Sequence, residues 1–431
     1  MKSERQIAVR LEDYVETNRD RLIEIVQDLV RIPSENIPPH GNERACQEYL
    51  AEFLHRLGWE VSIYELNQTE GLQSHPLYWP GRDYLNRPNL AARKKGMGNG
   101  QSLVLSGHID TVPRGTQVWS RDPFGAQIED NRLYGRGSND MKSGIGISLF
   151  VAEALRELGL ELQGDLIVES VVDEEFGGVN GTLAGRLMGF NGDAAIIGEP
   201  TGLKVCPAQR GGHFAHITFE APGGILLREG QSVGVVDQVG HFLSGVRDFA
   251  ETRRRSAKAH DLYAHLVDPV PVLITKLCTG PWGMHEPIGI PETCKLEVYW
   301  QALPDEEPEV VQEQFDEWLS QLVSAAPEIF PKKPVVESPL RILPGSAIPR
   351  TDPLVTAFAD CATDSLGEEP EVVGIEAPCD MYVFHQFGIP ALLWGPGGGN
   401  THTSDEYVEI DSLVIAARVL LNFVCRWCAV K

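Results

Sequence analysis

The segment SLVLSGHID, residues 102–110, is an apolar run that ends in two polar side chains, His108 and Asp110. Two later segments have the same form: DLIVESVVDEE at residues 165–175 and AAIIGEP at residues 194–200 are apolar runs that end in acidic side chains. A helical pattern separates each run from the next. Strands that alternate with helices predict a mostly parallel sheet with helices on both faces.

The order of predicted elements changes near residue 210. Residues 210–342 follow the order strand, helix, strand, strand, helix, strand, which predicts an inserted α+β sandwich. Strand and helix patterns then resume and end in an apolar helix. A chain of 431 residues is long enough for more than one core. We therefore predict an α/β domain from residues 1–209 and 343–431, with residues 210–342 as a second domain.

The composition limits the partners that we expect. The chain has 61 acidic and 37 basic residues and a formal net charge of -24 at pH 7. This charge repels polyanions, so we expect no nucleic acid partner. The N-terminal segment is charged and helix-patterned, without an apolar stretch of membrane-spanning or signal-peptide length, so we expect neither membrane insertion nor export. Eight cysteines without a disulfide-scaffold spacing fit a reducing compartment, and we expect a cytoplasmic protein.

His108 and Asp110 lie two residues apart at the end of a predicted strand. Side chains at this spacing project to the same side, so the Asp110 carboxylate can reach the His108 imidazole. A histidine that binds a metal donates its second N–H to such a partner. An ordinary surface hydrogen bond explains the pair equally well when it is considered alone.

Four further side chains follow strand or turn patterns in the same way. Asp140 lies in the glycine-rich segment LYGRGSNDMKSGIG, where an N-cap of the next helix is the alternative role. Glu175 ends the second apolar run, Glu199 ends the third, and His402 lies in the glycine-rich segment after the last predicted strand. Because ligands bind at the carboxyl ends of parallel strands, we expect these side chains and His108 to meet at one edge of the sheet.

This set of imidazole and carboxylate ligands predicts a centre for two divalent metal ions. Ligands of this kind suit zinc, manganese or cobalt, and a shared carboxylate holds two ions about 3.5 to 4 Å apart. Such a pair polarises a carbonyl group and lowers the pKa of a bridging water to about 7. Glu174, beside Glu175 but pointing elsewhere, is then placed to carry a proton to a leaving nitrogen.

The motifs GHIDTVP, YGRGSNDMKSG, DEE, GEPT and GNTH occur in this order over most of the chain. In this order they resemble the family of dinuclear metallohydrolases that contains acetylornithine deacetylase, succinyl-diaminopimelate desuccinylase, aminoacylase and carboxypeptidase G. The resemblance implies that the inserted domain is a lid that carries a homodimer or higher homo-oligomer interface. It also implies a role for each motif residue: His108 and Glu199 on one ion, Glu175 and His402 on the other, Asp140 bridging both, Asp110 orienting His108, and Glu174 as general base.

Two lid positions depart from the family pattern. The family's lid histidine, which stabilises the developing oxyanion, corresponds to Leu227, and an arginine that pairs with a substrate carboxylate corresponds to Gln301. His213, His216 and His241 are candidates to replace the histidine. Gln301 lacks the charge for bidentate carboxylate recognition.

We therefore predict a metal-dependent hydrolase that cleaves an amide-type C–N bond of a small N-acyl amino acid or peptide-like substrate. One alternative is hydrolysis of another C–N bond, such as that of an aryl amine or carbamoyl group, by the altered lid. Aromatic residues of the inserted domain, such as Trp282 and Trp300, would favour a flatter or more apolar substrate, but core packing explains them equally well. A second alternative is a noncatalytic binding protein of the same fold.

Overall fold

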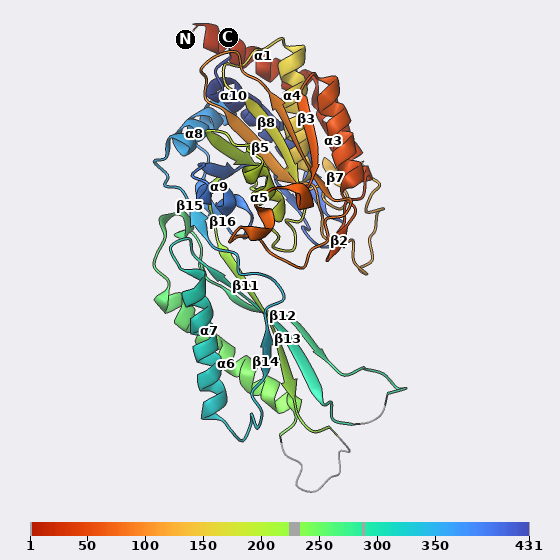
Figure 1. Cartoon of the computed structure of the whole chain (residues 1–431), viewed down its shortest axis with the longest axis vertical. Helices are drawn as coiled ribbons and strands as arrows, with labels where there is room; N and C mark the ends of the chain where they lie inside the picture. The colour runs from red at the N-terminus through yellow and green to blue at the C-terminus, as the bar shows by residue number, and fades with distance from the viewer. Residues whose placement is uncertain (1, 224–232, 287–288, 431) are drawn as a thin grey trace. The chain divides into compact units, whose positions relative to one another are not determined.

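The structure is a computed structural model that describes residues 2–223, 233–286 and 289–430 (Figure 1). The chain divides into two compact units. The first contains residues 1–208, 347–375 and 379–431, and the second contains residues 209–346 and 376–378.

The first unit is built on a twisted sheet whose centre is parallel. Strand β5 lies between β8 and β9, and β17 follows β9, all with parallel pairing. Beyond β8, strands β4 and β3 pair antiparallel, and β10 pairs antiparallel with β17. The predicted α/β fold is confirmed, with antiparallel pairing toward both edges of the sheet. The bounds are β3 Glu60–Glu65, β4 Pro88–Lys94, β5 Leu103–His108, β8 Leu166–Val171, β9 Ala194–Ile197, β10 Val205–Gln209, β15 Ser346–Ala347, β16 Val372–Ile375 and β17 Ala391–Leu393.

Helices cover the faces of this sheet, which explains why every residue of β5 and β8 is buried. Helix α9 packs with residues of β5, β8, β9 and β17 in one hydrophobic cluster. Helices α4 and α10 pack together, as do α10 and α8. Their bounds are α4 Lys142–Glu157, α5 Asn180–Leu187, α8 Pro353–Leu366, α9 Met381–Gln386 and α10 Ile410–Trp427.

The N-terminal region contains more helix than its apolar spacing indicates. The pattern predicts one helix before residue 32 and one after residue 43, whereas the structure has α1 Lys2–Thr17, α2 Arg19–Arg31 and α3 Arg44–Arg56. The break falls at Asn18, whose side chain bonds to the carbonyl of Tyr14 at 2.9 Å. Short elements complete this region: β1 Asn36–Ile37, β2 His40–Gly41, and single turns at Leu66–Gln68 and Leu72–Ser74.

A small antiparallel sheet joins two distant segments of the first unit. Its order is β18–β19–β7–β6, so residues after 397 pair with residues before 135. The segment between β18 and β19 carries His402, and the segment after β7 carries Asp140. The bounds are β6 Gln127–Glu129, β7 Arg132–Tyr134, β18 Gly398–Gly399 and β19 Tyr407–Glu409.

The second unit is an antiparallel sheet with two helices packed on one face (Figure 1). The sheet order is β12–β13–β11–β14. Its core is aromatic, with Trp300 stacked on Phe315 at 4.4 Å between ring centres and Phe249 edge-on to the same indole. The bounds are β11 Gly211–Glu220, α6 Val235–Ser256, a turn at Asp261–Tyr263, β12 Val272–Thr279, β13 Thr293–Ala302, α7 Pro308–Ala325 and β14 Val335–Glu337.

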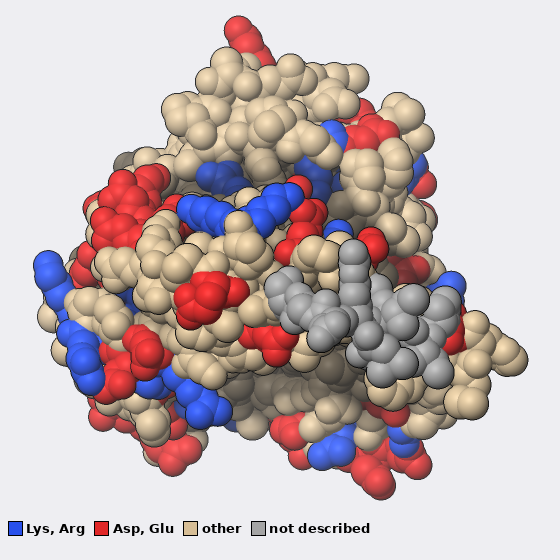
Figure 2. Space-filling model, turned by 90° about the horizontal axis from the view of Figure 1, so that it is seen from below, with Lys and Arg blue, Asp and Glu red and all other residues tan. Residues whose placement is uncertain are grey.

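Two surface properties bear on the predicted partners. Acidic and basic side chains are interspersed on the face drawn in Figure 2. Among the described residues, none of the helices combines the length and the hydropathy that a bilayer crossing needs.

Candidate metal centre

The predicted ligands come from the carboxyl ends of neighbouring parallel strands. His108 is the last residue of β5, Glu199 follows β9, and Glu175 lies in the turn after β8. Since these strands are adjacent and parallel, their ends meet at one edge of the sheet. Asp140 and His402 reach the same edge from the segments that follow β7 and β18.

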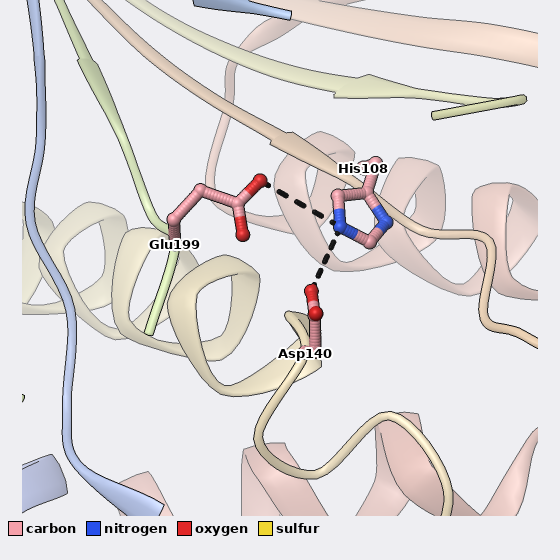
Figure 3. Close-up of side chains that lie close together, drawn as sticks. All are labelled: His108, Asp140 and Glu199. Carbon is pink, nitrogen blue, oxygen red and sulfur yellow. Dashed lines mark hydrogen bonds and ion pairs between the residues drawn. The ribbon is translucent and has the colours of Figure 1, made fainter. Parts of the chain in front are cut away.

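The first group of ligands comprises His108, Asp140 and Glu199 (Figure 3). His108 Nε2 lies 3.0 Å from Asp140 Oδ1 and 3.7 Å from Glu199 Oε1. Figure 3 shows both carboxylates directed at the same imidazole nitrogen. His108 and Glu199 are buried, so this group lies below the molecular surface.

The second group comprises Asp140, Glu175 and His402. His402 Nε2 lies 2.8 Å from Glu175 Oε2 and 3.3 Å from Asp140 Oδ2. Asp140 therefore faces one histidine with each of its carboxylate oxygens. This is the arrangement that a carboxylate bridging two ions requires.

A close backbone contact brings Asp140 near the end of β9. Helix α4 begins at Lys142, and Gly144 lies so close to Gly198 that an added Cβ would be 2.0 Å from the Gly198 carbonyl oxygen. Only glycine permits this approach. Asp140 is not the N-cap of α4, because Met141 holds that position and the Asp140 side chain contacts the two histidines.

The electrostatics of the cluster favour a bound cation. Burial raises the pKa of Glu175 and, more strongly, of Glu199, and nearby carboxylates raise them further. Burial would lower the pKa of His108, but its hydrogen bond with Asp140 and the charge of Glu199 raise it well above the ordinary value. Burial would raise the pKa of Asp140, but the bonds from His108 and His402 lower it. Divalent ions bound here would offset the repulsion among these buried carboxylates.

Asp110 lies behind His108, but its carboxylate contacts other groups. His108 Nδ1 is 2.9 Å from the main-chain oxygen of Asp110 and 3.7 Å from its Oδ1, so the carbonyl is the nearer partner. The Asp110 carboxylate accepts hydrogen bonds from the backbone N–H groups of Glu174 and Glu175, each at 3.2 Å. Asn36 Nδ2 donates to the same carboxylate at 2.8 Å. Asp110 therefore connects His108 with the turn that follows β8.

Glu174 lies next to the first ligand group. Its Oε2 is 3.8 Å from His108 Nε2, but within the described residues it belongs to neither group of ligand atoms. Burial raises the pKa of Glu174 well above its ordinary value, and the charge of Glu199 adds to that increase. A carboxylate with a raised pKa accepts a proton more readily than an ordinary carboxylate does.

The lid positions singled out in the sequence have mixed outcomes. Leu227 lies outside the described residues. Gln301 is buried, and its amide nitrogen donates to the Tyr299 hydroxyl at 2.6 Å and to the Glu376 carbonyl at 2.7 Å.

The three histidines and two tryptophans singled out in the second unit have different surroundings. His213 is buried against Trp300, at 5.2 Å between ring centres, so Trp300 is a core residue. His216 Nε2 is 2.9 Å from Glu297 Oε2, and His241 lies edge-on to Phe330. Trp282 is fully exposed.

Three acidic or amide side chains near the ligands were not singled out by the sequence patterns. Asn36 bridges the carboxylates of Asp110 and Asp173. Glu406 accepts four hydrogen bonds from residues 136–140. Asp380 is buried, accepts a hydrogen bond from Thr182, and through its charge raises the pKa of Glu174 and Glu199. Glu406 could have been found from the sequence because it lies in the same segment as His402. Neither Asn36 nor Asp380 directly follows an apolar run, so the sequence patterns did not indicate them.

The donor set fits two divalent ions. Each group offers one imidazole nitrogen and carboxylate oxygens, with all ligand atoms of a group within 4.8 Å of one another. Imidazole and carboxylate without thiolate are ligands that suit zinc, manganese or cobalt.

Comparison with known proteins agrees with this geometry. An N-formyl-4-amino-5-aminomethyl-2-methylpyrimidine deformylase from Halalkalibacterium halodurans is 27% identical over 97% of both chains. An acetylornithine deacetylase from Edwardsiella ictaluri is 29% identical over 80% of this chain and 84% of its own. The solved structure of the di-peptidase Dug1p from Saccharomyces cerevisiae has the same fold, with a TM-score of 0.79 at 15% identity over 98% of each chain.

The model of peptidase family M20/M25/M40 matches residues 104–426, which include all five predicted ligands. The resemblance found in the sequence motifs is thereby confirmed, and so is the prediction of a metal-dependent hydrolase. The chain belongs to peptidase family M20/M25/M40.

Proposed function

We propose that this protein hydrolyses the amide bond of a small N-formylated or N-acylated amine, with water as the nucleophile. The observation that carries the proposal is the position of Glu174, 3.8 Å from His108 Nε2 and outside both ligand groups of the described residues. A noncatalytic binding protein has no need of a buried base at this position.

The proposed roles of the ligands follow the two groups. His108 and Glu199 would hold one ion, Glu175 and His402 would hold the other, and Asp140 would be shared between them. The support is the pair of distances from Asp140, 3.0 Å to His108 and 3.3 Å to His402, which use different carboxylate oxygens. Zinc is the proposed metal, with manganese or cobalt as alternatives, because all three accept imidazole and carboxylate ligands.

The chemical step needs one proton transfer in each direction. When bound, divalent ions would polarise a carbonyl oxygen and lower the pKa of water toward neutral. Glu174 would accept a proton from the attacking water as its oxygen bonds to the amide carbon, and would then give that proton to the nitrogen as the C–N bond breaks. Asp110 holds His108 and the backbone of Glu174 in place through the contacts described above. The products are a carboxylic acid, such as formic acid, and a free amine.

The proposed substrate class follows the relative that aligns over nearly the whole chain. That relative is named for removing a formyl group from an aminomethylpyrimidine, which carries no carboxylate. The neutral, internally bonded side chain of Gln301 fits such a substrate, because it offers no cation to a carboxylate. An N-acyl amino acid is the second candidate, favoured by the similarity to the acetylornithine deacetylase.

A substrate panel with defined metals tests the proposal. The purified protein is loaded with zinc, manganese or cobalt and incubated with an N-formyl aminomethylpyrimidine, an N-acetyl amino acid and a dipeptide, and the released amine is quantified. We expect the formyl compound to be cleaved with the highest kcat/KM. Absence of divalent ion binding, together with absence of turnover on every compound, would contradict the enzyme assignment.

The base is tested separately with Glu174→Gln. We expect a loss of about 10²- to 10⁴-fold in kcat, the usual contribution of a general acid–base group. Metal content should stay at the wild-type value, because Glu174 is not a proposed ligand. The exposed residue Glu70 provides a matched control, since Glu70→Gln removes the same charge without a contact to the site. Turnover by the Glu174 variant near the wild-type rate would show that another residue is the base.

We also propose that the second unit is the lid and carries a homodimer interface, as the family resemblance implies. A cytoplasmic location is proposed from the eight cysteines, all of which lie in the described residues and form no disulfide bond there. Sedimentation of the purified protein tests the dimer directly.

A further inference from the structure

Glu406 is a buried carboxylate that holds the turn of the bridging ligand. It lies four residues after His402 and is 1% exposed. Its Oε2 accepts hydrogen bonds from Arg136 Nη1 at 2.6 Å and Gly137 N at 3.1 Å. Its Oε1 accepts from the backbone N–H groups of Asn139 and Asp140, each at 3.1 Å. All four donors belong to the turn that ends at Asp140.

The N–H groups of this turn need an acceptor. Helix α4 begins only at Lys142, so residues 137–140 lie before the regular helical hydrogen bonds. A buried N–H group without a partner costs free energy comparable to a lost hydrogen bond. A carboxylate has about four lone-pair sites, so one Glu406 side chain satisfies the three N–H groups and the guanidinium together.

The same residue fixes the segment that carries His402. His402 has a φ of +63°, and Asn400 and Asp405 have φ values of +56° and +57°, all in the left-handed region. Non-glycine residues adopt this region at an energetic cost and persist there only when surrounding contacts hold them. Glu406 supplies such contacts, and Asn139 Nδ2 adds a hydrogen bond to Thr401 Oγ1 at 2.8 Å.

We propose that Glu406 is a positioning residue for the metal centre and that it sets the separation of Asp140 and His402. The inference rests on the proposed function only in requiring that the site binds two divalent ions. Glu406 contacts neither ligand side chain, and it acts through the backbone of Asp140 and through its own short connection to His402. Asp140 must meet His402 and His108 at the same time, so a small shift of either segment separates ligand atoms that now lie 3.3 Å apart.

The test measures metal affinity directly. Glu406→Gln keeps the size of the side chain but replaces one acceptor oxygen with an NH₂ group. This NH₂ group would face backbone N–H donors, and Arg136 would lose its negatively charged partner. Chelator competition with zinc and with manganese should show a loss of about 10- to 100-fold in affinity, the usual effect of removing a group that supports a ligand. With saturating metal, kcat should fall while KM stays within about twofold, because Glu406 is not proposed to touch the substrate.

Two further variants separate positioning from a merely structural role. Glu409→Gln removes a nearby exposed carboxylate and should bind both metals as the wild type does. Thr401→Val removes only the acceptor of the Asn139 amide while it preserves shape, and we expect a smaller but measurable loss of affinity. The Thr401 variant alone decides the question if the Glu406 variant does not fold.

The outcomes are distinguishable from failure of the proposed function. If the wild-type protein binds no divalent ion, the proposed function is wrong. If the wild type binds two ions and the folded Glu406 variant binds them with unchanged affinity, the positioning role is wrong while the proposed function stands. If Glu406→Gln does not fold and Thr401→Val binds zinc and manganese as the wild type does, the positioning role is also wrong.

Discussion

Asn36 provides the sharpest test of how the catalytic turn is held. Its side chain is fully buried, and Nδ2 lies 2.8 Å from Asp110 Oδ2 and 3.1 Å from Asp173 Oδ1. Asn36 Oδ1 has no hydrogen-bond partner among the described residues, so the two carboxylates set the orientation of the amide. Asp173 immediately precedes Glu174, and its φ of +68° lies in the left-handed region. Asn36 thus links the carboxylate behind His108 to the start of the turn that carries the proposed base.

The substitution Asn36→Asp replaces this donor with an acceptor of the same shape. Two hydrogen bonds to charged groups are lost, each worth about 1.5 to 3 kcal/mol, so the free energy of unfolding should fall by about 3 to 6 kcal/mol near pH 8. Burial and two neighbouring carboxylates disfavour the ionised form of the introduced carboxyl group, so its pKa in the folded variant is raised above that of the unfolded chain. The folded variant then binds more protons than the unfolded one, and its stability relative to the wild type rises as the pH falls toward about 5.

Urea unfolding of the metal-loaded protein near pH 8 and near pH 5 measures both effects. Asn99 is exposed, so Asn99→Asp adds the same charge at the surface and should leave stability within about 0.5 kcal/mol of the wild type. The catalytic constant should also fall, because the backbone of Glu174 is bonded to the same Asp110 carboxylate. A loss below about 1 kcal/mol near pH 8, or a loss that does not shrink near pH 5, would refute the bridging role of Asn36.

Three further predictions follow from the same contacts. Metal affinity, measured by chelator competition, should fall as the pH is lowered from about 8 to about 6, because protons compete for imidazoles whose pKa is raised by neighbouring carboxylates; a constant affinity would contradict this. Arg87→Met should lower the free energy of unfolding by about 3 to 5 kcal/mol near pH 8, because it leaves the buried Glu43 carboxylate without its cationic partner. Burial already raises the pKa of Glu43 to about 7 beside Arg87, and loss of that cation raises it further, so this cost should shrink as the pH falls and Glu43 is protonated; urea unfolding near pH 8 and near pH 5 decides it. Trp300→Ala should cost about 3 to 5 kcal/mol in calorimetry, and the exposed Trp282→Ala should have almost no effect; equal effects would place Trp300 outside the core.

The central strands were predictable because each is a short apolar run between helical patterns. In β5 and β8 every residue is buried, which is the pattern that a strand covered on both faces produces. The antiparallel pairing of β3 and β4 at the edge of the sheet was harder to predict from the sequence. β3 and β4 pair directly although residues 66–87 separate them, and nothing in the irregular composition of that segment indicates the direction of the return.

The grouping of the candidate ligands was predictable for a related reason, since His108, Glu175 and Glu199 directly follow apolar runs. The side chains that support them were not. Asn36 contacts carboxylates that lie 74 and 137 residues later, and Glu406 contacts a backbone N–H group 266 residues earlier. Only the folded chain brings such partners together, so the local pattern of apolar residues does not predict them. Asp110 illustrates the same limit, because its place two residues after His108 was visible but the backbone donors that occupy its carboxylate were not.

Gln301 bears most directly on the substrate. Its side-chain amide nitrogen donates to the Tyr299 hydroxyl and the Glu376 carbonyl, and its main-chain carbonyl oxygen accepts from Arg253. The residue therefore links β13 to residues 376–378 of the same unit, and its donor hydrogens are already used. An arginine would bring a charge into a position that is 4% exposed, and the neutral amide avoids that cost. A substrate with a carboxylate would have to find its cation elsewhere, whereas an N-formyl amine without a carboxylate needs none. The neutral side chain at position 301 is therefore consistent with the substrate class proposed above.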